Sequence, residues 1–117
     1  MATYAVPTAK SYQTAFLALA ARMTATRRKL LHAHYHSPHH QATATQIAAA
    51  MGWTNYVSAN AHYGKLAQSV ADQLGFHPAG CHLNALTTFV APTEPGDQFL
   101  IIMRPQVANA LEQLGWV

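Results

Sequence analysis

The chain has 117 residues, half of them apolar and only 9% charged, and its formal net charge is +3. This length fits a single globular domain, and the apolar content excludes a disordered chain. The single cysteine, Cys81, excludes an internal disulfide, and no apolar run reaches 18 residues, so we expect a cytoplasmic protein that does not span a membrane.

The N-terminal part is expected to be an arm followed by helices. We predict a flexible arm at residues 1–10 and one domain at residues 11–117. A helix is predicted to start near Lys10 or Ser11, because apolar residues then recur at steps of four, three and four: Tyr12, Phe16, Leu19 and Met23.

The next helical segment has an ambiguous start. Either Thr24 or Thr26 caps a second helix, or the first helix continues. Its end is better defined, because the residue before Pro38 avoids the helical conformation. The apolar face of this segment is predicted to comprise Leu30, Leu31, His34 and Tyr35, and residues 39–42 are expected to be a linker.

Residues 41–74 predict a helix-turn-helix. Thr43 and Gln46 have the spacing of a capping box, and Gly52 is suited to the left-handed conformation that ends a helix. The first helix is expected to bury Ile47, Ala48, Ala50 and Met51. Asn55 is a favourable cap for the second helix, which Gly75 ends and whose buried stripe is predicted to be Tyr56, Ala59, Tyr63, Leu66, Val70 and Leu74.

The C-terminal part predicts a β-hairpin and one more helix. Residues 78–85 are expected to be loop, and the β-branched and aromatic residues at 86–90 and 98–103 are typical of two paired strands. Pro105 begins a helix that Gly115 ends, with a buried face of Val107, Ala108, Leu111 and Leu114. The predicted fold is α+β, mainly α. It is a winged helix-turn-helix-like domain with an extra N-terminal helix, a β-hairpin wing and a C-terminal helix.

The charges favour a nucleic-acid-binding surface in the first part of the chain. Residues 1–71 carry six Lys or Arg and no carboxylate, whereas residues 72–117 carry one Arg and four carboxylates. A basic segment that contains a helix-turn-helix is typical of DNA-binding proteins, although exposed cations also serve solubility alone. The residues predicted to contact DNA are Arg27, Arg28, Lys29, Thr54, Asn55, Ser58, His62 and Lys65.

These residues divide by the part of DNA that they suit. Polar side chains near the start of a recognition helix read base edges, as predicted for Thr54, Asn55, Ser58 and His62, whereas cations neutralise phosphates. Ser58, His62, Lys65 and Ser69 step by four, three and four, so they share one side of the second helix. The other interpretation is an ordinary amphipathic helix with a polar outer face.

Metal binding and catalysis have weaker support. Five histidines lie at positions 32, 34, 36, 39 and 40, but no carboxylate or cysteine stands among them to complete a zinc site. Cys81 and His82 are adjacent, which seldom lets a base activate a nucleophile, and no orienting carboxylate is evident. We therefore expect no metal site, no cofactor and no enzymatic activity.

Four stretches of the sequence form recognisable motifs: residues 43–56 (TATQIAAAMGWTNY), residues 60–67 (NAHYGKLA), the final stretch 103–117 and the earlier run RKLLHAHY at 28–35. Together they resemble the N-terminal DNA-recognition domain of bacterial HNH-type, modification-dependent restriction endonucleases. The resemblance covers about residues 24–117. It implies a module that recognises double-stranded DNA, including modified DNA.

The chain departs from that family in one respect. In those proteins a nuclease domain with paired histidines and zinc-binding cysteines follows, whereas this sequence has one cysteine and ends at Val117. The nuclease activity is therefore not expected here. The alternative function is a small protein-interaction module, such as a phage-encoded inhibitor of a bacterial defence complex of the anti-CRISPR kind.

Overall fold

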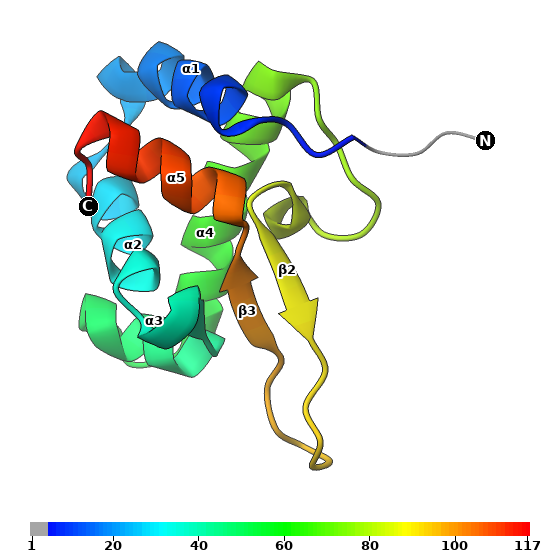
Figure 1. Ribbon diagram of the computed structural model, residues 1–117. Helices are drawn as coiled ribbons and strands as arrows, with labels where there is room; N and C mark the ends of the chain where they lie inside the picture. The colour runs from blue at the N-terminus through cyan, green and yellow to red at the C-terminus, as the bar shows by residue number, and fades with distance from the viewer. Residues whose placement is uncertain (1–4) are drawn as a thin grey trace.

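The computed structural model describes residues 5–117 as a mainly helical α+β fold with one small antiparallel sheet (Figure 1). The coarse fold class predicted from the sequence is therefore confirmed. In chain order the elements are α1 (Ala9–Leu19), α2 (Ala25–Tyr35), β1 (Gln41–Ala42), α3 (Ala44–Met51), α4 (Tyr56–Leu74), β2 (Thr87–Val90), β3 (Leu100–Met103) and α5 (Pro105–Leu114).

Two threonines define the first two helices. The Thr8 side chain accepts a hydrogen bond from the Ser11 amide, so α1 begins at Ala9, within the segment predicted to be an arm. The rest of that predicted arm includes residues 1–4, which lie outside the described residues. Thr24 caps α2, so the first helix does not run on into the second. A short 3₁₀ turn, Ala20–Arg22, separates the two helices.

The two consecutive helices predicted within residues 41–74 are present as α3 and α4, joined by a short turn. Thr43 and Gln46 form a reciprocal capping box, because each side chain accepts a hydrogen bond from the other residue's amide, at 3.2 and 2.9 Å. The buried face of α3 differs from the prediction at two positions, Ala44 and Ala50. Ala50 is exposed, and the residues that α3 buries are Ala44, Ile47, Ala48 and Met51.

The sheet has the strand order β1–β3–β2, with both pairs antiparallel. The hairpin was predicted, but its strands begin at Thr87 and Leu100 and so are shorter than expected. The predicted linker was wrong in part, because Gln41 and Ala42 pair with Ile102 and Ile101. The predicted loop at 78–85 contains a 3₁₀ turn, His82–Ala85. The hairpin extends away from the helices (Figure 1).

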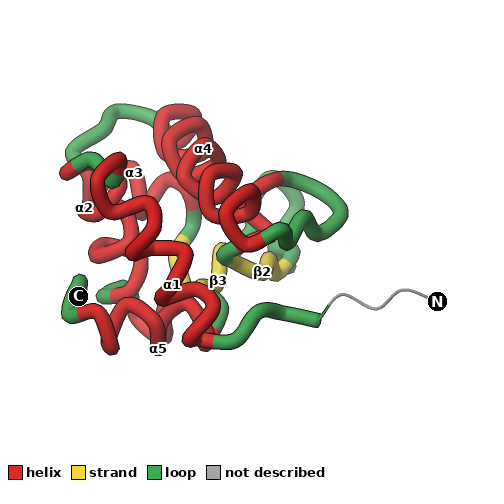
Figure 2. Tube along the Cα trace, turned by 90° about the horizontal axis from the view of Figure 1, so that it is seen from above, coloured by secondary structure: helices red, strands yellow, loops and turns green. Residues whose placement is uncertain are grey.

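One apolar core joins all five helices and β3. Helix α1 packs against both α4 and α5, so elements from the two ends of the described chain meet. The view from above in Figure 2 shows these three helices near one another, with the loop of residues 5–8 leading away from α1. No helix in residues 5–117 is long and apolar enough to cross a membrane.

A buried hydrogen-bonded histidine connects three elements of this core. His34 of α2 has no exposed surface; its Nδ1 lies 2.7 Å from the Tyr63 hydroxyl of α4 and its Nε2 lies 2.9 Å from the Ile101 carbonyl of β3. Because a carbonyl can only accept, Nε2 carries the proton and Nδ1 accepts from Tyr63. This single tautomer satisfies all three groups.

Candidate nucleic-acid interface

The turn between α3 and α4 is fixed at both ends. Gly52 adopts the left-handed conformation at φ 77°, and the amide of Trp53 donates to the Ala48 carbonyl at 2.9 Å, which ends α3. The Asn55 side-chain oxygen then accepts from the amides of Val57 and Ser58, which begins α4. The direction of α4 relative to α3 is therefore set by the capping residues expected from the sequence.

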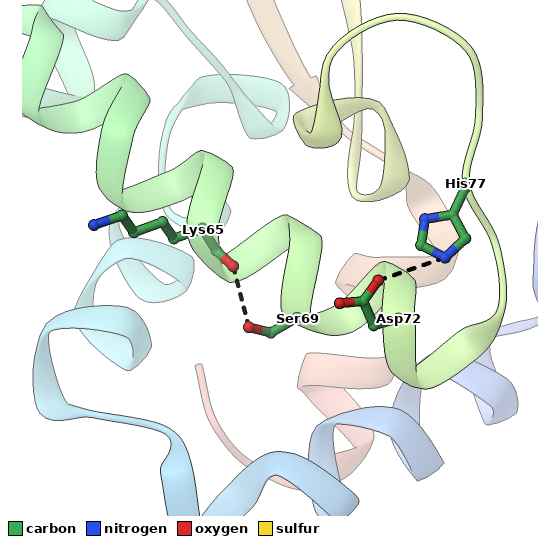
Figure 3. A network of polar contacts seen from close by, with 4 residues as sticks. All are labelled: Lys65, Ser69, Asp72 and His77. Atoms are coloured by element: carbon green, nitrogen blue, oxygen red, sulfur yellow. Dashed lines mark hydrogen bonds and ion pairs between the residues drawn. The ribbon is translucent and has the colours of Figure 1, made fainter.

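The polar side of α4 has the predicted spacing. Ser58 and Ser69 are half-buried, whereas His62 and Lys65 are exposed. The Ser69 hydroxyl donates to the Lys65 carbonyl at 3.2 Å (Figure 3). Asp72 continues the row, and its carboxylate lies 3.5 Å from Nε2 of His77. Figure 3 shows the Lys65 ammonium pointing away from these contacts. Within residues 5–117 this ammonium has no ion pair.

Two of the predicted base-reading residues have structural contacts. His62 stacks on the half-buried Trp53 ring, with centroids 4.8 Å apart and planes 23° from parallel. The Asn55 oxygen is engaged by the two helix amides, so only its NH₂ group can donate to a ligand. Thr54 is exposed in the turn. The row therefore offers the hydroxyls of Thr54 and Ser58, the NH₂ group of Asn55 and the exposed imidazole of His62.

The three consecutive cations lie at the far end of α2 from the helix-turn-helix. Arg27 is half-buried, whereas Arg28 and Lys29 are exposed. The Arg28 guanidinium lies 4.4 Å from the centre of the Trp116 ring, near the end of α5. The eight steps from Arg27 to Tyr35, the last residue of α2, advance about 12 Å along the helix axis. The structure therefore does not gather these cations beside the first turns of α4.

Charge around the helix-turn-helix and hairpin is low. Between residues 41 and 103 the only Lys or Arg is Lys65, while three carboxylates, Asp72, Glu94 and Asp97, lie in the same segment. The last two stand in the loop that joins β2 to β3. A phosphate-contacting role for the tip of this hairpin would therefore rest on backbone amides rather than on cations.

The histidines between positions 32 and 40 have separate surroundings. His34 is buried, the rings of His32 and His36 lie 4.3 Å apart, and the Nδ1–H of His40 donates to the Tyr35 carbonyl at 2.6 Å. Residues 5–117 contain no group of three or more His, Cys, Asp or Glu side chains placed to hold a metal ion.

One prediction for α4 was wrong, and the error reveals a feature that sequence reasoning missed. Tyr56 was expected on the buried stripe, but its side chain is 47% exposed. It lies in the first turn of α4, where it lines an open groove with residues of the hairpin, including Phe89 and Phe99. Helical periodicity gives the direction of a side chain, but not whether another element covers it.

Comparisons with protein-family models, with curated proteins and with solved structures found no match to this chain. The resemblance of its motifs to the recognition domain of restriction endonucleases therefore stays a prediction from the sequence.

Proposed function

We propose that this chain is a non-catalytic module that binds double-stranded DNA through a winged helix-turn-helix. The observation that supports this most is the order α2–β1–α3–α4–β2–β3 combined with the strand order β1–β3–β2. It sets a hairpin beside a capped helix-turn-helix, and in such proteins the second helix of the pair enters the major groove. Because the chain's motifs resemble those of modification-dependent enzymes, cytosine-modified duplex is the second DNA ligand to test.

In this proposal α4 presents its polar side to DNA. Thr54, the Asn55 amide, Ser58 and His62 contact base edges, and Lys65 contacts a phosphate. Arg27, Arg28 and Lys29 lie in the first turns of α2, at the end away from α3 and α4. They contact flanking phosphates only if the duplex extends along α2 to that end.

The dependence of DNA affinity on salt shows whether Lys65 alone contacts a phosphate or whether Arg27, Arg28 and Lys29 do so as well. Each neutralised phosphate contributes about −0.9 to the slope of log K against log salt. Contacts from all four cations predict a slope near −3.6, whereas contact from Lys65 alone predicts about −0.9. Fluorescence anisotropy with a duplex of random sequence, titrated at several salt concentrations, measures this slope.

Lys65→Ala is the first variant to test. It is expected to weaken binding about equally on all sequences and to reduce the magnitude of the slope by about one, because one phosphate contact is lost. Lys10→Ala is the matched control: Lys10 is an exposed cation that lies beside Gln73 and Leu74 at the opposite end of α4. Equal effects of the two substitutions, or no binding of either plain or cytosine-modified duplex at low salt, would contradict the proposal.

A protein-interaction module is the second candidate, and one observation favours it. Tyr56, Val57 and Phe99 are large apolar side chains exposed on the N-terminal part of α4 and on the hairpin. Exposed aromatic residues are common at protein interfaces. A partner of a bacterial defence system that binds the chain stably, without competition from duplex DNA, would support this candidate over the first.

A further inference from the structure

An open groove of about 480 Å³ lies between the first turns of α4, the start of α3, the 3₁₀ turn His82–Ala85 and the β2–β3 hairpin. This volume is within the range of sites that bind small molecules or single chemical groups. The side chains that line it are mainly aromatic, aliphatic or carboxamide, and none of them is charged.

Three aromatic side chains form the apolar part of the groove. Tyr56 comes from α4, whereas Phe89 and Phe99 come from the hairpin, where their rings meet edge to face at a centroid distance of 6.3 Å. Tyr56 and Phe99 are 47% and 53% exposed. Exposed aromatic faces in a concave site favour a flat ligand that can stack on them.

Three carboxamides supply the polar part, and two of them are held in place. The Gln98 side-chain oxygen accepts from the Thr45 amide at 3.0 Å, which leaves its NH₂ as a donor. The Asn84 NH₂ donates to the Ala79 carbonyl at 2.8 Å, which leaves its oxygen as an acceptor. Asn60 makes no hydrogen bond with residues 5–117 through its side chain, so it can donate and accept.

The Asn84 segment is held by a further contact. Arg104 donates through Nη2 and Nε to the Asn84 backbone carbonyl, at 2.8 and 3.2 Å. This fork fixes the 3₁₀ turn against the end of β3. The acceptor at Asn84 and the donor at Gln98 are therefore positioned before any ligand arrives, which lowers the entropy lost on binding.

We propose that this groove binds an uncharged nucleobase, stacked on Tyr56 and Phe99 and hydrogen-bonded along its edge by the carboxamides. A base is planar, neutral and carries donors and acceptors side by side, which Asn and Gln side chains match. An apolar side chain of a protein partner fits less well, because it would bury the same carboxamides without hydrogen-bond partners. The base comes either from a free nucleoside or from an extrahelical position in a duplex, and the second source rests on the DNA-binding function proposed above.

Cys81 gives a direct measure of occupancy. It is the only cysteine of the chain, it is exposed, and it lines the groove. The rate at which iodoacetamide alkylates the folded protein, followed by intact mass, is expected to fall at least threefold with millimolar nucleosides and to stay unchanged with ribose. Absence of protection by adenosine, cytidine, guanosine, thymidine and 5-methylcytidine would overturn the free-nucleoside source.

Two substitutions remove ligand contacts with little effect on the fold. Phe99→Ala deletes an exposed ring, and Asn60→Ala deletes an exposed amide that has no hydrogen bond within the described chain. Each is expected to weaken nucleoside protection of Cys81 at least tenfold. Leu17→Ala, which removes an exposed apolar side chain from α1, is the matched control and is expected to leave protection unchanged. Circular dichroism of all three variants checks that they are folded.

Duplex DNA with one unpaired base distinguishes the two sources. Phe99→Ala and Asn60→Ala are expected to reduce its affinity to that of the fully paired duplex, whereas Lys65→Ala lowers both affinities. If neither duplex binds but nucleosides protect Cys81, the DNA-binding function fails and the groove is a nucleoside site. If duplex binds without preference for the unpaired base and nucleosides give no protection, the groove proposal fails and DNA binding stands. The groove proposal is also overturned if an apolar peptide protects Cys81 from alkylation and no nucleoside does.

Discussion

His34 makes the stability of the protein depend on pH in a defined direction. Burial lowers its pKa below the ordinary value of 6.5, against the opposing effect of the hydrogen bond to Ile101. The unfolded chain therefore binds a proton more readily than the folded chain between the lowered pKa and about 6.5. The contribution of His34 to the free energy of unfolding is therefore full above about pH 6.5. It is lost as the pH falls from 6.5 toward the lowered pKa of the folded protein.

The substitution His34→Gln is expected to flatten that dependence. Glutamine does not titrate, so the free energy of unfolding should change less between pH 7.5 and pH 5 than in the unsubstituted protein. The variant should also be less stable at pH 7.5, by about 1–3 kcal/mol, because the Tyr63 and Ile101 groups lose well-aligned partners. Urea denaturation across this pH range measures both effects. The exposed His32→Gln is the control, and equal pH dependence in all three proteins would show that His34 is not responsible.

Single residues also show where sequence reasoning stops. The capping roles of Thr43, Gln46 and Asn55 were predictable, because each depends on neighbours within three residues. The exposure of Tyr56 was not, since it depends on whether the hairpin and α3 cover the first turn of α4. The carboxamides of the groove gave no signal in the sequence, because Asn60, Asn84 and Gln98 meet only in the folded chain.

Among the elements, α3 is the clearest test of a local sequence signal. Thr43→Ala removes the acceptor for the Gln46 amide and is expected to cost about 0.5–2 kcal/mol of stability, as the loss of a helix N-cap usually does. Thr45→Ala is the matched control, since the contact of Thr45 with Gln98 is made by its backbone amide and is retained. Thermal denaturation of the two variants measures the difference. An equally large loss in Thr45→Ala would mean that the capping box contributes little.

The strands show which elements the sequence predicted poorly. The β2–β3 hairpin was recognisable because its strands are close in the sequence and rich in β-branched and aromatic residues. In contrast, β1 has two residues and pairs with Ile101 and Ile102, about 60 positions later. A two-residue strand has no periodicity, so only the tertiary structure reveals it.

At the scale of the molecule, the contact between Arg28 and Trp116 joins α2 to the segment after α5. Trp116 also packs on Phe16 of α1, with ring centroids 5.7 Å apart, so one indole contacts two distant helices. Arg28→Ala is expected to cost about 0.5–1 kcal/mol through the lost cation–π contact, whereas Lys29→Ala, the next residue, should be nearly neutral. Trp fluorescence during urea unfolding reports on both variants.

That comparison also decides how DNA-binding data on α2 are read. A variant that weakens DNA binding while it lowers stability has disturbed the fold, and Arg28→Ala carries that risk. If Arg28→Ala and Lys29→Ala have the same stability, the contact with Trp116 contributes little to folding. A loss of DNA affinity in Arg28→Ala then reports on a contact with DNA.

The packing of α1 on α5 has a consequence during protein synthesis. Tyr12 and Phe16 of α1 are fully buried in the finished fold, partly by α5, and the Tyr12 hydroxyl donates to the Ala85 carbonyl at 2.5 Å. The ribosome makes Pro105 only 86 residues after Leu19. At a typical rate of about 5–20 residues per second, the apolar side of α1 waits several seconds in the cell before its partner exists. Until residues 105–114 have been made, the part of α1 that packs on α5 stays uncovered.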